Sequence, residues 1–424
     1  MDEYSRRALD DELDALLPDL AAVAIDGAKG VGKTQTAVQR AGTIRALDVP
    51  GELEVARANP QHLLIGTPPV LIDEWQRFPE SWDLVRRAVD AGAEAGRFIL
   101  TGSATPRTPG THSGAGRIVH LRMRPLSFAE RQRESATVSL AALLSGSRPA
   151  IDGETSLTLE DYVEEICCSG LPGIRGLGRR ARRAQLDGYI ERIIDRDFAE
   201  AGRTIRNPAA LRRWMGAYAA ATATDASYEK LLDAATPGEG DKPAKGTTAA
   251  YRDVLERLWL VDPLAGWSPT HNQLKRLVAS PKHHLADPAL ATRLLGLDEG
   301  GLLDIFNATE PAVRDGTYLG HLFESLVTLS LRVYAQHAEA SVYHLRTKAG
   351  RHEIDHIVER DDRRVVAVEV KLTHTVLDAH VEHLRWLRGQ IGDDLLDAVV
   401  VSTGRWAYRR ADGIAVVPLA LLGP

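Results

Sequence analysis

Residues 27–34, GAKGVGKT, fit the spacing G-x-x-x-x-G-K-[ST] through Gly27, Gly32, Lys33 and Thr34, and Gly30 adds a third glycine. Glycines in such a loop let the backbone curl until its N–H groups point inward at phosphate oxygens. Lys33 would contact the β- and γ-phosphates of a nucleotide, and the Thr34 hydroxyl would ligate Mg²⁺. The predicted cofactor-binding residues are Gly27, Ala28, Lys29, Gly30, Val31, Gly32, Lys33, Thr34 and Gln35.

A glycine-rich turn can match this pattern by chance, and the flanking segments argue against that interpretation. An apolar run, AAVAID at 21–26, precedes the loop, and a helical pattern follows from Lys33. Strand, loop and helix in this order is the setting in which the pattern binds phosphate, since a helix N-terminus also faces the anion. The sequence has no NKxD guanine-reading motif, so ATP is favoured over GTP.

Polar residues end two further apolar runs. VLIDE at 70–74 places Asp73 at the carboxyl end of a buried strand, where it is predicted to hold the Mg²⁺ shell. Glu74 is predicted to orient and deprotonate the attacking water. RFILTGS at 97–103 ends at Ser103, which is predicted to contact the γ-phosphate or the water, the alternative being a hydrogen-bonded turn residue.

A second set of chemically competent residues lies near the C-terminus. HEIDHIV puts Asp355 in one predicted strand, and VAVEVKL puts Glu369 and Lys371 in another. Because residues i and i+2 of a strand face the same side, Glu369 and Lys371 should project together. Two carboxylates can bind Mg²⁺ or Mn²⁺, and a lysine can activate a hydrolytic water beside a phosphate. Glu324, in LFESLV on the preceding predicted helix, would add a third ligand. An exposed hairpin with alternating charges is the alternative.

The elements that must position these residues indicate several domains. Short apolar strands alternate with helical stretches over 1–130, which is typical of an α/β domain with a parallel sheet. A mostly helical, arginine-rich pattern covers 131–248, and helices followed by a short β wing are expected over 249–310. Residues 311–424 open with a predicted helix and continue with four predicted strands.

The chain resembles the AAA+ superfamily, and most of all compact bacterial ATPases whose C-terminal half is a domain of unknown function with a restriction-endonuclease-like core. The phrases that carry the resemblance are GAKGVGKT, PPVLIDEWQRFPESWDLVRRAVD, RFILTGSATP, GAGRIVHLRMRPLSFAE, LVASPKHHLADPALATRLLG, GTYLGHLFESLV and HEIDHIVERDDRRVVAVEVKL. The resemblance implies an AAA+ P-loop domain over 1–130, a linker over 131–248, a winged-helix-like region over 249–310 and a PD-(D/E)xK nuclease-like domain over 311–424.

The same resemblance implies that Arg117, in GAGR, is an arginine finger. Such an arginine enters a neighbouring subunit's site and neutralises transition-state charge, so a homo-oligomer is expected. From the residues alone, an exposed salt bridge is the alternative.

Composition and charge restrict the partners. The formal net charge of −6 argues against a protein that coats nucleic acid over its whole surface. Residues 179–213 nevertheless carry ten arginines against five acids, which makes them a candidate DNA-binding face or, equally, a helix of paired charges. The adjacent Cys167 and Cys168 are not expected to pair with each other. The start of the chain lacks a signal peptide and no apolar stretch would span a membrane, so a cytoplasmic protein without a membrane partner is expected.

Three functions fit these observations. The first is an ATPase that couples its nucleotide state to DNA binding, with metal-dependent DNA cleavage as a further activity. The second is an ATP-dependent switch whose inactive nuclease fold holds DNA or a protein partner. The third, a small-molecule kinase, is weaker because Glu74 directly after Asp73 favours water as the nucleophile.

Overall fold

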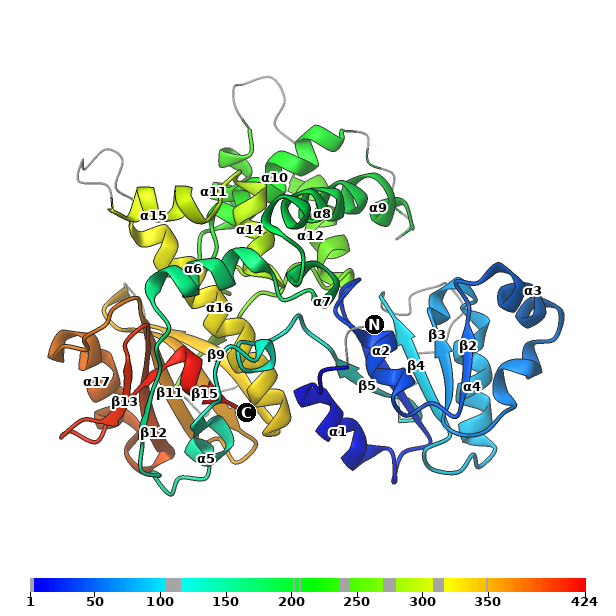
Figure 1. The fold of residues 1–424 in the computed structure, drawn as a ribbon, viewed down its shortest axis with the longest axis horizontal. Helices are drawn as coiled ribbons and strands as arrows, with labels where there is room; N and C mark the ends of the chain where they lie inside the picture. The colour runs from blue at the N-terminus through cyan, green and yellow to red at the C-terminus, as the bar shows by residue number, and fades with distance from the viewer. Residues whose placement is uncertain are drawn as a thin grey trace. The chain divides into compact units, whose positions relative to one another are not determined.

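The computed structural model of the 424-residue chain describes residues 4–103, 116–200, 203, 205, 207–236, 245–269, 280–307, 316–347 and 350–424. It comprises two compact units (Figure 1). The N-terminal unit consists of Met1–Pro125 and Leu255–Leu260, and the C-terminal unit of Leu126–Val254 and Val261–Pro424. No described helix is both long and apolar enough to cross a membrane.

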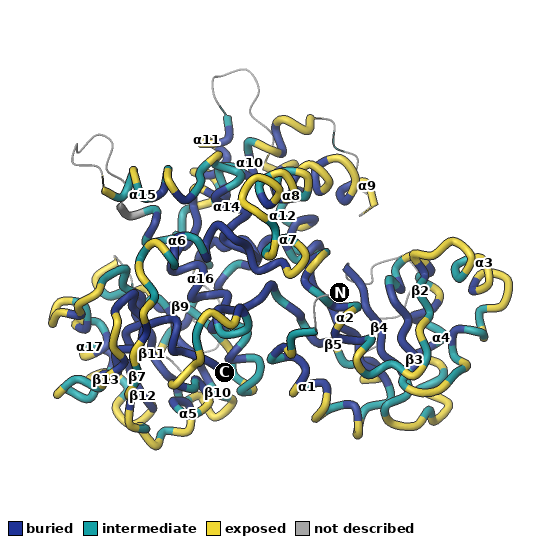
Figure 2. Tube along the Cα trace, viewed as in Figure 1, coloured by how far each residue is buried: buried dark blue, intermediate teal, exposed yellow. Residues whose placement is uncertain are grey.

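The N-terminal unit is built on a five-stranded parallel sheet in the order β2-β3-β4-β1-β5. Its strands are β1 (Ala22–Asp26), β2 (Thr43–Ala46), β3 (Val70–Asp73), β4 (Phe98–Gly102) and β5 (Val119–Arg122). Its helices are α1 (Ala8–Leu16), α2 (Lys33–Val38), α3 (Pro50–Ala58) and α4 (Glu80–Asp90). β1, β3 and β4 are buried throughout, because both faces of a parallel sheet are covered. Figure 2 shows β4 in dark blue, the colour of buried residues. The three strands predicted in this region are thereby confirmed.

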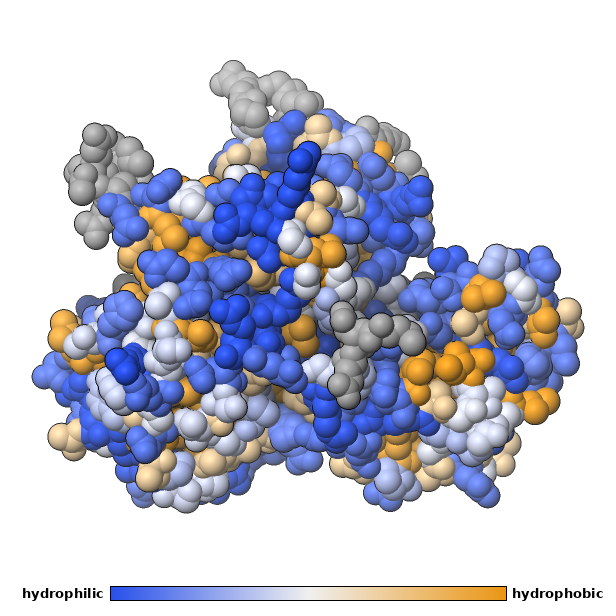
Figure 3. Space-filling view, in the orientation of Figure 1, coloured by the Kyte–Doolittle hydropathy of each residue, from blue (hydrophilic) through white to orange (hydrophobic). Residues whose placement is uncertain are grey.

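The helical part of the C-terminal unit follows the N-terminal sheet in the chain. Its helices are α5 (Leu140–Leu144), α6 (Leu159–Cys168), α7 (Pro172–Arg175), α8 (Arg179–Arg192), α9 (Phe198–Glu200), α10 (Pro208–Ala220), α11 (Tyr228–Ala234), α12 (Lys245–Arg257, whose residues from Leu255 onward belong to the N-terminal unit), α14 (Pro288–Leu294) and α15 (Glu299–Asn307). Hydrophilic side chains cover most of the face of this part seen in Figure 3. Cys167 and Cys168 do not pair with each other, as predicted; both are buried free thiols, and burial raises the pKa of Cys167 to about 12.

Three isolated bridges tie the helical part together. Thr222 pairs in parallel with His283, while Leu264 and Lys282 form an antiparallel bridge, as do Val261 and Leu285. Backbone pairing therefore holds the segment around Lys282 both to Thr222, before α11, and to Val261 and Leu264, after α12.

An eight-stranded mixed sheet completes the C-terminal unit, in the order β7-β13-β14-β12-β11-β10-β9-β8. Its strands are β7 (Gly153–Glu154), β8 (Gly266–Trp267), β9 (Ala340–Arg346), β10 (Glu353–Arg360), β11 (Val365–Lys371), β12 (Leu395–Ser402), β13 (Trp406–Arg409) and β14 (Ala415–Pro418). α16 (Gly316–His337) and α17 (Glu382–Ile391) contact it, and β6 (Val138–Ser139) pairs with β15 (Leu422–Gly423) in a separate ribbon. The helix and four strands predicted here are confirmed.

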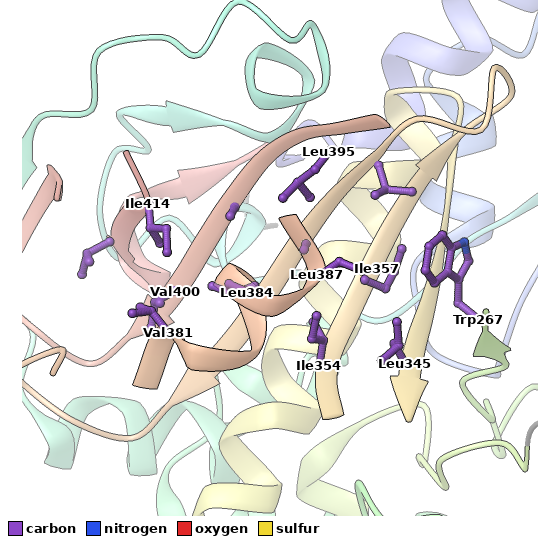
Figure 4. Close-up of a cluster of buried hydrophobic side chains, with 14 of the residues drawn as sticks. Trp267, Leu345, Ile354, Ile357, Val381, Leu384, Leu387, Leu395, Val400 and Ile414 are labelled. Atoms are coloured by element: carbon purple, nitrogen blue, oxygen red, sulfur yellow. The ribbon is translucent and has the colours of Figure 1, made fainter. Parts of the chain in front are cut away.

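The core of the mixed sheet lies beneath α17, as Figure 4 shows. Leu384 and Leu387 of α17 pack against the sheet residues Ile354, Ile357 and Val400, all of which are buried. Ile354 and Ile357 of β10 and Val365 and Ala367 of β11 belong to this core, and both strands are buried over most of their length. This packing fixes the strands that carry Asp355 and Glu369.

Candidate nucleotide site and C-terminal charge cluster

The loop predicted to bind phosphate connects β1 to α2, and its backbone requires glycine. A Cβ atom at Gly27 would lie 2.2 Å from the carbonyl oxygen of Met123, just beyond β5. Gly32, immediately before α2, has a φ of 106°, in the left-handed region that residues with a side chain rarely adopt. Sheet pairing between β1 and β5 thus leaves room only for a bare backbone at the start of the loop.

Lys33 is buried at the centre of this loop. Its Nζ donates hydrogen bonds to the carbonyl oxygens of Gly27 and Ala28, each at 2.9 Å. Burial lowers the pKa of Lys33 to about 8, although the carboxylates of Glu74, Asp26 and Asp73 favour the charged form. The ammonium is therefore held by neutral carbonyl groups that phosphate oxygens could replace.

Thr34 and Asp73, predicted to share one Mg²⁺, are in direct contact. The Thr34 hydroxyl donates to Asp73 Oδ1 at 2.8 Å, and the Thr101 hydroxyl donates to the same oxygen. Hydroxyl and carboxylate oxygens are the hard donors that Mg²⁺ prefers, usually together with substrate phosphates. The two residues therefore fit the predicted role.

Glu74 and Ser103 are linked by a residue that the sequence interpretation gave no role. Gln76 Nε2 donates to Glu74 Oε2 at 2.6 Å and to Ser103 Oγ at 3.3 Å. Glu74 itself adopts a left-handed conformation, with φ 55° and ψ 44°, which turns the chain sharply after β3. Gln76 lies in the IDExQ phrase, so its position two residues after Glu74 was the available signal.

A second unpredicted pair lies at the end of β1. Asp26 is buried directly before the loop, and its Oδ2 lies 2.6 Å from Nδ1 of the part-exposed His120 on β5. In the described part of the chain, Asp26 Oδ1 has no hydrogen-bond partner. An acid at the end of the run AAVAID was the only sequence signal for this carboxylate.

The remaining predicted loop residues line the edge of the site. Lys29 is half-buried, Gln35 is exposed and Val31 is buried. The Val31 carbonyl accepts a hydrogen bond at 3.0 Å from Nη1 of the buried Arg7, which braces the loop from outside.

Arg117 forms an exposed ion pair within its own chain. Its Nε donates to Asp90 Oδ1, at the end of α4, at 2.8 Å, and this hydrogen bond is the main cause of the lowered pKa of Asp90. This is the alternative that the residues alone allowed. Because an arginine finger acts on a second copy of the chain, that role stays a prediction.

Asp355, Glu369 and Lys371 converge as predicted. Lys371 Nζ lies 2.7 Å from Glu369 Oε2 and 3.7 Å from Asp355 Oδ2. The backbone N–H of Val370 donates to Asp355 Oδ2 at 2.9 Å, which fixes that carboxylate beside β11.

A second lysine, which sequence reasoning missed, joins this cluster. Lys282 Nζ lies 2.8 Å from Glu324 Oε1, 3.0 Å from Glu353 Oε1 and 3.3 Å from Asp355 Oδ1. Burial disfavours its charge, but these three carboxylates outweigh burial and raise the pKa of Lys282. Burial also opposes ionisation of Asp355, yet Lys282 and Lys371 hold the pKa of that carboxyl well below its usual range.

The predicted metal role of Glu324, Asp355 and Glu369 does not fit this arrangement. The ammonium of Lys282 lies within hydrogen-bonding or ion-pairing distance of two of the three carboxylates and so provides the positive charge expected of the metal. Across the described ranges, no group of three or more His, Cys, Asp or Glu side chains is arranged to hold a metal ion.

Part of the arginine-rich face is paired with acids. Arg182 and Arg183 of α8 pair with Glu299 and Asp298, at the start of α15. Arg192 lies 3.6 Å from Asp197. These arginines match the paired-helix interpretation more closely than the DNA-binding one.

Three parts of the chain match known families. Residues 20–132 match an AAA domain, residues 159–300 match a domain of unknown function (DUF8612), and residues 319–422 match another (DUF4143). The first match agrees with the nucleotide-binding domain expected over 1–130.

Two curated proteins from mycobacteria match most of this chain, and two solved structures of archaeal proteins match about two thirds of it. The uncharacterized proteins Rv2008c of Mycobacterium tuberculosis and Mb2031c of Mycobacterium bovis are each 27% identical to this chain over 403 residues, which is 93% of this chain and 79% of theirs. A Walker-type ATPase of Pyrococcus abyssi has a TM-score of 0.40 at 17% identity, over 69% of this chain and 96% of its own. The ORC2 protein of Aeropyrum pernix has a TM-score of 0.27 at 16% identity, over 68% and 89%.

Proposed function

We propose that this protein, whose residues 20–132 form an AAA-type Walker ATPase domain, hydrolyses ATP and uses its nucleotide state to control DNA binding by its C-terminal unit. The observation that carries the ATPase activity is the direct contact between Thr34 and Asp73 beside the buried Lys33. Residues of the phosphate loop after β1 and of β3, which is separated from β1 by β4 in the sheet, meet there, as phosphoryl transfer to water requires.

Each group has a defined part in hydrolysis. Lys33 exchanges its carbonyl partners for β- and γ-phosphate oxygens, and Thr34 with Asp73 would hold Mg²⁺. When bound, the ion neutralises charge on the phosphate oxygens. Glu74 accepts a proton from the attacking water, and Gln76 orients that carboxylate through its amide hydrogen bond.

The DNA-binding part of the proposal is supported by the order of elements around α12. The elements here follow the order found in a winged helix. That order is α10, the bridge at Thr222, α11, α12 and then the bridges at Val261 and Leu264. Those elements begin at residue 208, earlier than the winged-helix-like region expected over 249–310. In helix-turn-helix proteins the second helix of the motif enters the major groove, so α12 rather than the charge-paired α8 is the proposed reading helix.

The C-terminal mixed sheet is proposed to act as a nuclease-like binding module. Asp355, Glu369 and Lys371 converge on adjacent strands as the PD-(D/E)xK pattern requires, but Lys282 contributes a second ammonium. This observation favours the switch with an inactive nuclease fold over the DNA-cleaving enzyme. We further propose that the ATPase works as a homo-oligomer completed by Arg117.

The test measures ATP turnover and DNA binding in the same preparation. Phosphate release is followed with and without single- and double-stranded DNA, and fluorescence anisotropy gives the DNA affinity with ATP, ADP or no nucleotide. We expect the DNA affinity to differ at least ~5-fold between ATP and ADP, which is the size of a typical coupling between two sites. We also expect DNA to stimulate ATP turnover. Affinity should fall steeply with salt.

The variant Lys33→Ala is the matched control, because its DNA affinity should no longer respond to ATP. If the wild-type protein hydrolyses ATP while DNA neither binds nor changes the rate, the DNA part of the proposal fails and a protein partner takes its place. Absence of any ATP turnover would overturn the ATPase part.

A further inference from the structure

Lys282 reaches the C-terminal carboxylates from a backbone that is held on both sides. Its N–H donates to the Leu264 carbonyl oxygen at 2.9 Å, and its carbonyl accepts from the Leu264 N–H at 2.8 Å. The next residue, His283, donates from its N–H to the Thr224 carbonyl oxygen at 2.9 Å. The lysine side chain is only 2% exposed. The ammonium is therefore delivered by a fixed part of the fold.

The ammonium is fully coordinated by carboxylates. An ammonium has three N–H donors, and Lys282 has three carboxylate acceptors within 3.3 Å: Glu324 on α16, and Glu353 and Asp355 on β10. A second ammonium, Lys371, pairs with Glu369. Each lysine thus takes a place between carboxylates that would otherwise repel one another.

We propose that the ammonium of Lys282 takes the place of a metal ion in this cluster. Glu324, Asp355 and Glu369 then bind no divalent ion in the wild-type protein. They form a Mn²⁺ or Mg²⁺ site only when the ammonium is removed. A divalent ion needs oxygen ligands at about 2.0–2.2 Å, and it would have to expel a buried positive charge to reach Asp355. Glu369 Oε1 is buried without a hydrogen-bond partner among the described residues, so this oxygen could bind a metal ion. ATP hydrolysis and DNA binding can each fail without changing this site.

The test replaces the ammonium by a group of similar length without charge. Lys282→Met and the wild type are compared in the full chain, both with Asp73→Asn so that the nucleotide site contributes no metal binding. Calorimetric titration with Mn²⁺ should show no binding to the Lys282 protein up to about 1 mM, and one site with Kd of about 100 µM or tighter in Lys282→Met. Adding Asp355→Asn to Lys282→Met should weaken that site at least ~10-fold, as loss of a charged ligand does.

Two controls separate charge from disturbance of the fold. Lys282→Arg keeps a cation and should bind no Mn²⁺. Lys371→Met removes the part-exposed lysine but leaves Lys282 in place, so it should also create no site. Mn²⁺ binding to the wild type that Asp355→Asn abolishes would overturn the proposal, as would a folded Lys282→Met without a Mn²⁺ site.

Lys282→Met leaves several acids unpaired and could unfold without metal. In that event circular dichroism should show Mn²⁺ restoring the folded state, because metal binding to the native site favours folding by mass action. A variant that stays unfolded at 1 mM Mn²⁺, a concentration about ten times the expected Kd, would count against the proposal.

Discussion

At the scale of single residues, the nucleotide site stabilises its own charges without phosphate. Lys33 donates hydrogen bonds to the carbonyl oxygens of Gly27 and Ala28, while Asp73 accepts hydrogen bonds from the hydroxyl groups of Thr34 and Thr101. Buried polar groups must be hydrogen-bonded, and these local partners provide the bonds. Nucleotide binding then exchanges one set of partners for another instead of ordering a disordered loop.

Binding and hydrolysis should separate at Lys33 and Glu74. Lys33→Ala should lose ATP binding in equilibrium titration with a fluorescent ATP analogue, because the phosphate charges lose their buried partner. Glu74→Gln should bind ATP as the wild type does yet release phosphate at least ~100-fold more slowly, a typical loss for removal of a general base. Turnover by Glu74→Gln at the wild-type rate would show that another group activates the water.

ATP affinity should depend on pH through Lys33. Burial lowers its pKa to about 8 in the nucleotide-free protein, and phosphate oxygens must raise that pKa again on binding. Above about pH 8, binding therefore takes up a proton, and Kd for ATP should rise by up to ~10-fold per pH unit, whereas it should be flat below about pH 7. Lys33→Arg is the control, since a guanidinium stays charged. A wild-type Kd that is constant up to pH ~9.5 would contradict this assignment.

At the scale of secondary structure, the site is the edge at which three parallel strands end. Asp26 of β1 lies opposite Gly102 of β4, and Asp73 of β3 lies opposite Thr101. Parallel pairing brings the carboxyl ends of the strands together, so residues far apart in sequence reach one edge of the sheet. Gly102 lets the short helix at Trp75–Arg77 pack against that edge.

Gly102→Ala should disturb this packing. A Cβ atom there would lie 2.4 Å from Trp75 Nε1 and 2.9 Å from Gln76 Oε1, so the helix that carries Gln76 must move. We expect a loss of about 1–3 kcal/mol in the free energy of unfolding, measured by denaturant titration, and slower ATP hydrolysis.

The matched control is Gly51→Ala in the exposed first turn of α3, where a Cβ atom meets nothing within 4 Å. This change should leave activity unaltered and be neutral or slightly stabilising, since alanine favours helix more than glycine does. Equal effects of the two substitutions would mean that the contact with Trp75 is unimportant.

At the scale of the whole molecule, the open question is whether one chain makes a complete ATPase. Arg117 is 49% exposed and pairs with Asp90 on the surface of its own unit. An exposed ion pair contributes little to stability, so this arginine is available to a second copy at small cost.

A mixing experiment tests this assembly. Arg117→Ala should bind ATP normally but hydrolyse it poorly, because an arginine finger contributes about 10³-fold or more to turnover. Mixing it with Lys33→Ala should restore part of the activity, since mixed oligomers contain intact composite sites, and specific activity of the wild type should rise with protein concentration. A strictly monomeric protein with full activity would exclude the finger.

The sequence by itself determined the local chemistry of both sites. The spacing of Gly27, Lys33 and Thr34 predicts a phosphate loop because the geometry that binds phosphate is contained in a few consecutive residues. The apolar run that ends in Asp73 predicts a second strand of the site for the same reason. Along β11, the period of two places Glu369 beside Lys371 without any knowledge of the fold.

Tertiary structure alone decided which partners these groups meet. Lys282 is 73 residues from Asp355 in the chain, and its ammonium reaches the carboxylates only because bridges to Leu264 bring its backbone there. In the same way, the pairing of β1 with β5 sets His120 against Asp26. A local pattern specifies residue types and spacing, whereas burial and long-range packing set the charges around each group. Those charges decide whether the carboxylates bind a metal ion or a lysine ammonium.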